Sequence, residues 1–590
     1  MKGRQFGARL TDNGASYRLW APAARRVDLV LEKPQPMQRH GEGWYGLEVV
    51  GVGAGTRYNF RIDGEIDVPD PASAFQPEDV FGPSELIDHD SFAWRARNWR
   101  GRPWAETVLI ETHVGAFTHA GTYRAMIEKL DHLAATGITA LELMPLADFA
   151  GSRGWGYDGV LWYAPDSAYG RPEDLKSLID EAHLRGLMVF LDVVYNHFGP
   201  EGNFLSRYAP AFFTGAHTPW GSAIDYRVLQ VRAFAIESAL GWLRDYRFDG
   251  LRLDAVNHIV TSPGESSMLH ELSVAVGQLA TESGRHIHLV VENGNNVAGL
   301  LDPTENPPRG KYRAQWNDDY HHAFHVLLTG ENRGYYGDFQ RSPIAGLARA
   351  LGSGFIYQGE FAPFWGRRRG APSGGLPPTA FVNFLQNHDQ IGNRALGDRL
   401  ESIADRKAIE AALAITLLAP MIPLLFMGEE WGSKVPFPFF CDFKGGLVEA
   451  VRTGRRREYG WAYAIHGHAV PDPLASATFR STRLDWEARG SGGCRERLAL
   501  VRKLLSIRQR EIVPRLEGAA FGRAHSRDDG LLVAHWRMGD GTTLELSANL
   551  SAAEIIHQAT EVKATSIWGT DPGGILPPWS VFCQIAPSNG

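Results

Sequence analysis

Four apolar runs in the middle of the chain each end abruptly in polar or charged residues, and this pattern most constrains the fold. The runs lead to Asn196 and His197, to Asp254, to Glu292 and to Asp389. Short apolar runs bounded by polar residues are typical of strands that are buried on both faces. The carboxyl ends of parallel strands meet at one edge of a sheet, where barrel enzymes build their active sites. We therefore expect these polar side chains to share one pocket.

The segments between the runs predict helices. Residues 173–186 and 231–246 carry apolar residues at helical spacing. Alternating strands and helices predict a parallel sheet that is covered on both faces. Further strands are expected at 314–316, 381–388 and 423–427. The predicted fold class is therefore α/β, with a (β/α)₈ barrel over residues 101–515.

The flanking regions contain short alternating strands and no long helical period. Residues 1–100 predict an immunoglobulin-like β-sandwich, and residues 516–590 predict an antiparallel β-domain. Trp20 and Trp44 could stack on sugars, but tryptophans on strands more often belong to the core, so we expect them there.

Two further segments stand out inside the barrel. An insertion at about 199–228, after the third strand, is rich in Pro, Gly and aromatic residues. Long connections of this kind are usually functional, so we expect it to form part of the pocket wall. The polar stretch at 366–375 is expected to be a mobile surface loop.

Length and charge exclude several classes of protein. The chain has 590 residues, which is enough for several domains. Its net charge is -7. Nucleic acids and anionic membranes favour a basic face, so we expect neither as a partner.

Cysteines and apolar segments place the protein in a reducing compartment. Three cysteines without ligand spacing, Cys441, Cys494 and Cys583, indicate neither a disulfide framework nor a zinc site. Residues 1–14 lack the apolar segment of a secretory signal, so we expect a cytoplasmic protein. Prolines interrupt the long apolar run at 411–428, which therefore predicts a helix, a turn and a strand instead of a membrane span.

Arg252 and Asp254 alternate with leucines on one predicted strand, so both point to the same face. A buried structural salt bridge and an active site are both open interpretations of this pair. In an active site, the arginine would keep the carboxylate of Asp254 ionised. Glu292 has fewer cations near it in the sequence, and we expect its pKa to be raised.

Four short motifs carry a resemblance to a known family. DVVYNH, GLRLDAV, VVEN and FLQNHDQ, in this order, resemble the motifs of the α-amylase superfamily of retaining glycoside hydrolases and transglycosylases. The resemblance implies that Asp254 is the nucleophile, that Glu292 is the general acid/base, and that Asp389 holds the distorted sugar. It also implies contacts to that sugar from Arg252, His197, His388 and Tyr157. It implies no cofactor, and although Asn196 matches a calcium ligand of some relatives, we predict no metal site.

Longer segments are similar to the trehalohydrolases of this superfamily. They include HVGAFTHAGTYRA, SRGWGYDG, AQWNDDYHH and LFMGEEWG. This resemblance implies hydrolysis of the α-1,4 bond next to the terminal trehalose of maltooligosyl trehalose, with related α-1,4-glucans as further ligands. It implies a functional partner, maltooligosyl trehalose synthase, which need not bind physically, and an N-terminal sandwich of the glycogen-binding type. Contacts to the trehalose end are expected from His258, Trp220, Asp318 and Glu429.

Two other functions remain open at this point. A glycogen-branching or debranching enzyme would share the sandwich, the barrel and the catalytic acids, and its products would distinguish it. A non-catalytic glucan-binding barrel would not need a complete set of buried charges. For a retaining hydrolase we expect the carboxyl groups of Asp254 and Glu292 to lie about 5–5.5 Å apart.

Overall fold

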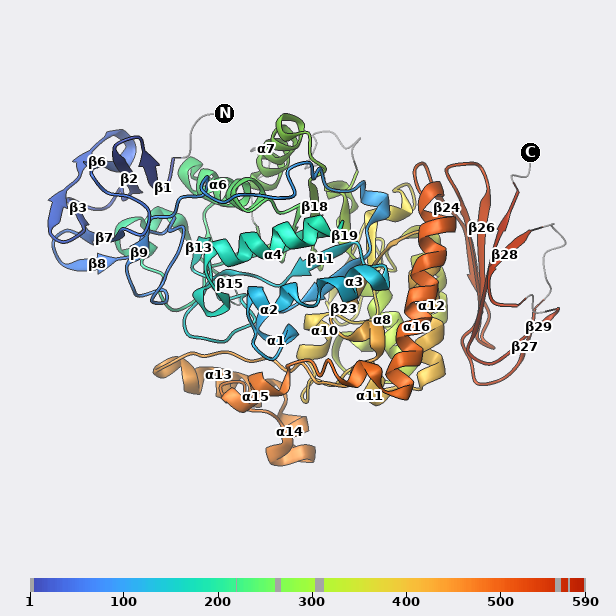
Figure 1. Cartoon of the computed structure of the whole chain (residues 1–590). Coiled ribbons are helices and arrows are strands. Elements are labelled where there is room, and N and C mark those ends of the chain that lie inside the picture. Colours follow the sequence, from blue (N-terminus) through green and yellow to red (C-terminus); the bar gives the residue numbers. More distant parts are fainter. Residues whose placement is uncertain are drawn as a thin grey trace.

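The computed structural model describes residues 5–218, 220–259, 267–302, 312–557, 564–570 and 573–587. Within these residues, eight parallel strands close into a barrel in the middle of the molecule. A β-sandwich lies at one end of the molecule and an antiparallel sheet at the other (Figure 1). The predicted fold class is confirmed.

The barrel strands are buried along their whole length. They are β10 (Leu109–Thr112), β11 (Ala140–Leu143), β14 (Met188–Val193), β17 (Gly250–Leu253), β18 (His288–Val291), β19 (Ala314–Trp316), β22 (Phe381–Phe384) and β23 (Ile422–Phe426). Apolar side chains such as Leu109, Phe190 and Trp316 fill the interior. Helices cover the outer face, so the strands are apolar on both sides, as the sequence predicted.

Strand register brings the polar side chains to one end of the barrel. β14 pairs with β17 so that Asp192 lies opposite Arg252. Leu251 and Leu253 point to the helical layer and are fully buried. Because side chains alternate along a strand, Arg252 points to the barrel interior.

The N-terminal sandwich packs against the barrel through its aromatic core. Its first main sheet has the strand order β1 (Gly7–Thr11), β2 (Gly14–Trp20), β6 (Trp44–Val50) and β5 (Gln38–Arg39). The second has the order β4 (Pro34–Pro36), β3 (Val27–Val30), β7 (Arg57–Ile62) and β8 (Ile66–Val68). Trp20 and Trp44 are buried, so the expectation that they belong to the core is confirmed. Phe6 lies between Trp44 and Phe234 of helix α6 (Leu229–Asp245), with ring centroids 4.9 and 5.1 Å away.

The C-terminal sheet follows helix α16 (Gly492–Ile507). Its strand order is β24 (Ala520–Ser526), β25 (Leu531–Arg537), β26 (Thr543–Asn549), β30 (Ser580–Ala586) and β28 (Thr565–Trp568). The Trp536 indole donates a hydrogen bond to the Leu351 carbonyl of helix α9 (Pro343–Ser353), which ties this sheet to the barrel.

The three cysteines are unpaired. Cys441 and Cys583 are buried, whereas Cys494 on α16 is partly exposed.

The apolar run at 411–428 forms the end of helix α12 (Arg406–Leu418), a turn, and strand β23, as predicted. Among the described helices, none is both long and apolar enough to cross a membrane.

Candidate active site

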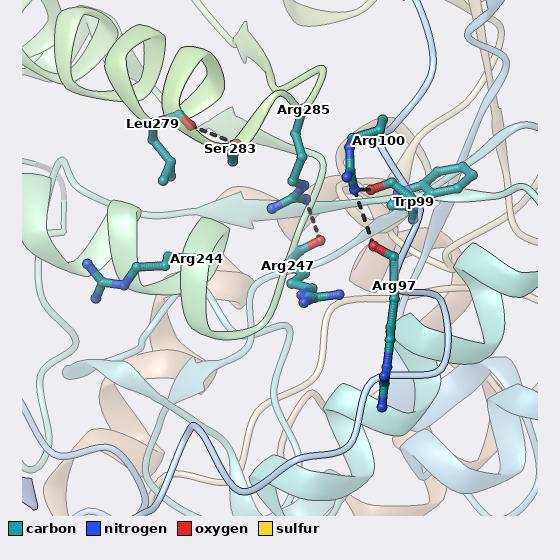
Figure 2. A pocket seen from close by; sticks show the side chains of 8 residues that line it. All are labelled: Arg97, Trp99, Arg100, Arg244, Arg247, Leu279, Ser283 and Arg285. Atoms are coloured by element: carbon teal, nitrogen blue, oxygen red, sulfur yellow. Dashed lines mark hydrogen bonds between the residues drawn. The ribbon is translucent and has the colours of Figure 1, made fainter.

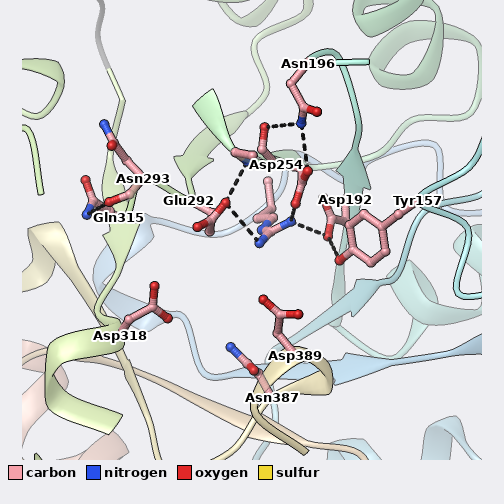
Figure 3. Close-up of polar contacts among 12 residues, drawn as sticks. Tyr157, Asp192, Asn196, Asp254, Glu292, Asn293, Gln315, Asp318, Asn387 and Asp389 are labelled. Atoms are coloured by element: carbon pink, nitrogen blue, oxygen red, sulfur yellow. Dashed lines mark hydrogen bonds and ion pairs between the residues drawn. The ribbon is translucent and has the colours of Figure 1, made fainter. Parts of the chain in front are cut away.

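Four carboxyl groups converge at the carboxyl end of the barrel. Asp254 follows β17 directly, Glu292 follows β18, Asp318 follows β19, and Asp389 lies after β22 in the short helix α10 (His388–Gly392). Figure 3 shows these side chains pointing into a shared space from different strands. The expected gathering of Asp254, Glu292 and Asp389 is therefore present in the structure.

Arg252 is the cation at the centre of this group. Its Nη1 lies 2.7 Å from Asp192 and 2.8 Å from Asp254, and its Nη2 lies 3.9 Å from Glu292. The guanidinium also lies over the Trp316 ring, 4.2 Å from its centroid. One buried cation thus contacts three carboxyl groups. Arg252 and Asp254 therefore do not form an isolated structural salt bridge, which the sequence also allowed.

The segment around Asp254 is held by its neighbours. The Asn196 side-chain amide donates to the Asp254 carboxylate at 2.7 Å and to its carbonyl at 3.0 Å. Ala255 has a left-handed backbone with φ of 42°. This conformation is costly for alanine and is typical of functional sites. It lets the Ala255 N–H donate to Glu292 at 2.7 Å.

The Asn196 Oδ1, which the resemblance matches to a calcium ligand of some relatives, contacts the His197 ring in a short hydrogen bond. Among the described residues, no group of three His, Cys, Asp or Glu side chains is arranged to hold a metal ion.

Glu292 lies deep in the pocket, although 21% of its side chain remains exposed. Burial raises the pKa of Glu292 to about 8. The negative charges of Asp254, Asp318 and Asp389 also raise this pKa, whereas the positive charge of Arg252 lowers it. A carboxyl group with this pKa is protonated at neutral pH. The predicted rise in pKa is confirmed.

His388 and Tyr157 form one wall of the pocket. Their rings stack with centroids 5.0 Å apart and planes 25° apart. The Tyr157 hydroxyl donates to Asp192 at 2.6 Å, and the His388 Nδ1 bonds to Glu111. Burial lowers the pKa of His388, but the Glu111 carboxylate outweighs it, so the pKa lies above its ordinary value. The imidazole is therefore poised to donate a hydrogen bond into the pocket.

Trp220 is brought to the opposite wall by the insertion, at the tip of the hairpin β15 (Phe213–Thr218) and β16 (Gly221–Ile224). Its ring stacks on His197 at 5.2 Å and 18°, and meets the His258 ring edge-on at 4.9 Å. Its side chain is 45% exposed. The structure therefore brings these three predicted residues together and offers an open aromatic surface.

Asp318 begins helix α8 (Asp318–Thr329) and belongs to the same pocket. Burial raises the pKa of Asp318 to about 7, with Asp389 adding to the rise. Asp389 itself accepts a hydrogen bond of 2.7 Å from the Asn393 amide, and Gln390 reaches Asp318 at 3.4 Å. Both acids are thus oriented by residues of the segment that follows β22.

The polar stretch at 366–375 is mostly exposed but has two buried residues, Arg369 and Ser373, and its mobility stays a prediction. Arg369 is buried and forms a short ion pair with Asp319, which is fully buried on α8. Its Nε donates to the Gly294 carbonyl at 2.7 Å, and Asp319 also accepts from the Asn296 amide at 2.9 Å. Gly370 leaves no room for a side chain, because a Cβ there would meet the Tyr357 carbonyl at 1.8 Å. The polar stretch therefore closes over the segment that follows Glu292.

Glu429, expected at the trehalose end, is also placed differently. The side chain is fully buried and accepts a hydrogen bond of 2.9 Å from the Phe426 N–H. Burial raises its pKa to about 8. Glu429 therefore turns into the protein below the pocket and does not contact its contents.

Three polar residues of the site were missed in the sequence. Asp192 lies in the DVVYNH motif with the spacing of an inward-facing residue, and Glu111 ends an apolar run as Glu292 does. The sequence therefore contained the information needed to predict both Asp192 and Glu111 as site residues. Asp319 carried no such signal, because its partner Arg369 is distant in the sequence and is joined to it only by the fold.

Comparison with known proteins agrees with this architecture. Family models match the carbohydrate-binding module 48 (isoamylase N-terminal domain) over residues 5–74 and the alpha amylase catalytic domain over residues 90–211. A third model, a domain of unknown function, matches residues 519–583. The sandwich, the start of the barrel and the C-terminal sheet thus each have counterparts.

Relatives that match most of this chain identify the family more closely than the domain models do. Malto-oligosyltrehalose trehalohydrolase from Deinococcus radiodurans is 44% identical over 85% of this chain and 82% of its own. The enzyme of the same name from Saccharolobus solfataricus is 39% identical over 82% of this chain and 84% of its own. A crystal structure of a provisionally named alpha amylase from Salmonella typhimurium superposes with a TM-score of 0.93 at 45% identity, covering 99% of this chain and 100% of that one. These relatives favour a trehalohydrolase over the branching-enzyme alternative, and the chain belongs to the malto-oligosyltrehalose trehalohydrolase family of glycoside hydrolases.

Proposed function

We propose that the protein hydrolyses the α-1,4-glucosidic bond next to the terminal trehalose of maltooligosyl trehalose, and so releases trehalose and a maltooligosaccharide. The observation that carries the chemistry is the contrast between two neighbouring carboxyl groups. Asp254 is paired with Arg252 at 2.8 Å, whereas burial raises the pKa of Glu292 to about 8. Such a pair supplies a carboxyl group bound to a cation beside one that holds a proton at neutral pH.

In the first proposed step, an Asp254 oxygen attacks the anomeric carbon while Glu292 gives its proton to the leaving oxygen of trehalose. The bond between the anomeric carbon and that oxygen breaks, and a glycosyl ester forms on Asp254. In the second step, Glu292 takes a proton from water, which attacks the same carbon and releases Asp254. The configuration at the anomeric carbon is retained.

Arg252 holds both carboxyl groups of the proposed pair near one cation. One guanidinium reaches both carboxyl groups, at 2.8 Å and 3.9 Å. A retaining pair lies about 5–5.5 Å apart, whereas an inverting pair is about 6.5–9.5 Å apart to leave room for water. We keep the shorter separation as the prediction for Asp254 and Glu292.

We assign the remaining pocket residues to two sugar positions. Asp389 and the side chains Arg252, His197, His388 and Tyr157 hold the sugar that is attacked. Trp220, His258 and Asp318 contact the trehalose that leaves, because Trp220 offers an exposed ring face beside His258. Flat aromatic faces combined with a few polar groups are typical of small-molecule sites.

The wider role that we propose is trehalose biosynthesis in the cytoplasm. The substrate would come from a maltooligosyl trehalose synthase, as a functional partner that need not form a complex. The buried positions of Trp20 and Trp44 support a packing role for the N-terminal sandwich.

Product analysis tests the proposal. The protein is incubated with maltoheptaose and, separately, with maltooligosyl trehalose of similar length, and the products are separated by chromatography. We expect rapid release of free trehalose from the second substrate and little cleavage of the first. Equal cleavage of both, or rearranged glucan chains, would contradict the proposed specificity and leave the catalytic pair intact.

A further inference from the structure

A basic pocket lies at the amino end of the barrel, opposite the active site. Its cavity of about 190 Å³ is lined by Trp99 and by the arginines Arg97, Arg100, Arg244, Arg247 and Arg285. Figure 2 shows the side chains of Arg97 and Arg244 extending away from the other three arginines. Three segments build it: the stretch that leads into the barrel, the end of α6, and the end of α7 (Met268–Ser283). Arg247 and Arg285 precede the starts of β17 and β18, which places the pocket at the amino ends of the strands.

Arginines outnumber carboxylates in this pocket. Arg244 pairs with Asp245 at 2.8 Å, and Arg285 pairs with Asp249 at 3.3 Å. Arg97, Arg100 and Arg247 form no ion pair with any carboxylate of the described chain. In a protein of net charge -7, this is a local reversal of sign.

Helix ends account for only part of the excess. Arg285 donates to the carbonyls of Leu243, Arg247 and Phe248, each at 2.8 Å, and so caps the end of α6. Basic residues at helix carboxyl ends are stabilised by the helix dipole. Arg100 donates through Nη1 to the Arg97 and Trp99 carbonyls at 3.2 and 3.0 Å. A guanidinium has five N–H donors, so Arg100 keeps others for a ligand.

Arg247 is held toward its like-charged neighbours at a cost. Its backbone is left-handed, with φ of 61°. Its guanidinium lies over the Trp94 ring at 4.5 Å. Burial lowers the pKa of Arg247, and the positive charges of Arg285 and Arg100 lower it further. A strained backbone that persists in a folded protein is a sign of function, and an anion in the pocket would offset the neighbouring positive charges.

We propose that this pocket binds a phosphate group, either as inorganic phosphate or as part of a sugar phosphate. The planar fork of arginine matches phosphate oxygens and bonds them in pairs. Pockets for drug-sized ligands measure about 300–1,000 Å³, so the cavity suits a small anion or the phosphate end of a larger ligand. The ligand neutralises the unpaired arginines and links the segment before the barrel to α6 and α7.

Isothermal titration of the full chain tests this site. Inorganic phosphate and glucose 6-phosphate are titrated separately, at an ionic strength kept constant with sodium chloride. We expect saturable binding of at least one probe, and the tighter of the two identifies the source of the phosphate. The double variant Arg100→Gln/Arg247→Gln should weaken binding at least tenfold. The matched control Arg457→Gln/Arg495→Gln removes two exposed charges elsewhere and should leave binding unchanged.

Two results would overturn the proposal. One is the absence of saturable binding to the unaltered protein. The other is an equal loss in the double variant and in its control, which would indicate attraction by overall charge alone. Arg247→Lys adds a variant that keeps the charge and loses the planar fork, and it should also weaken binding. Circular dichroism shows that each variant is folded before its titration is interpreted.

Discussion

The carboxyl end of the barrel has an excess of acidic groups, and the amino end has an excess of basic groups. The repulsion within each group is offset in a different way. At the carboxyl end, Asp192, Asp254 and Glu292 share Arg252. At the amino end, five arginines meet two paired carboxylates. A carboxyl group can take up a proton, whereas a guanidinium in a protein does not lose one. The acidic end is therefore relieved by protonation, and the basic end needs solvent or a bound anion.

The comparison offers a physical origin for the acid that we propose. Crowding of carboxyl groups around one cation is unfavourable, and the protein reduces its cost by keeping protons on Glu292 and Asp318, whose pKa values rise to about 8 and about 7. The proton on Glu292 reduces the repulsion between the carboxyl groups. We propose that the same proton is transferred to the leaving group. No such reagent can arise from an excess of arginine.

The largest expected effect tests whether the acidic excess is functional. Glu292→Gln removes the proposed proton donor and should lower the rate of trehalose release by about 10²–10⁴-fold, the usual contribution of general acid catalysis. Binding of maltooligosyl trehalose, measured by calorimetry, should persist. Glu410→Gln, at the partly exposed partner of Arg406, is a control that makes the same side-chain change away from the pocket and should keep full activity. A loss smaller than tenfold in Glu292→Gln would exclude it as the acid.

A second variant removes the cation that the acids share. Arg252→Met leaves buried carboxylates without a partner and should lower the free energy of unfolding by about 3–5 kcal/mol. Urea denaturation measures this change. The control Arg349→Gln breaks an exposed pair with Glu360 and should cost less than about 1 kcal/mol. Equal losses in both variants would mean that the acidic end does not depend on its arginine.

The pH dependence of kcat/KM probes the protonated carboxyl directly. The active form holds a proton on Glu292, and it is lost as the pH rises through about 8, so activity should fall tenfold per pH unit above that value. Asp318→Asn removes a negative charge that raises this pKa, and should move the fall to lower pH by up to about one unit, or about 1.4 kcal/mol. Asp472→Asn, at a partly exposed site outside the pocket, should leave the profile in place. An unchanged pH profile in Asp318→Asn would mean that Asp318 does not raise the pKa of Glu292.

The smallest effect is expected at the basic end. Without phosphate, Arg100→Gln relieves repulsion and breaks no ion pair, so the free energy of unfolding should change by less than about 0.5 kcal/mol. Urea denaturation again provides the measurement. A loss above about 1 kcal/mol would show that Arg100 holds the fold together, and the contrast between the two ends would then weaken.

The sequence predicted the parts of the site that depend on strand ends. Arg252 and Asp254 follow from period-two alternation, and Glu292 from the acid that ends an apolar run. Glu429, expected in the pocket from the resemblance, lies elsewhere, because the chain turns at Gly428, with φ of 86°, and buries the side chain below the pocket. A strand end shows that a residue is near the rim and does not show which way the next turn points it.

Contacts between distant segments lay beyond sequence patterns. The ion pair of Arg369 and Asp319 joins a polar stretch to the face of a helix, and neither residue has a local reason to be buried. The arginine pocket likewise gathers side chains from three separate segments that carry no motif. Such contacts depend on how the helices and connections pack around the barrel, which periodicity does not specify.

The unpaired cysteines have a practical consequence for following this enzyme in solution. The thiolate is the form that reacts with alkylating dyes, and burial suppresses it. Burial raises the pKa of Cys441 to about 12 and raises that of Cys583 as well, whereas Cys494 on α16 remains partly exposed. A maleimide fluorophore should therefore attach at a single position of the unaltered chain, and it would provide an optical reporter without any engineered site.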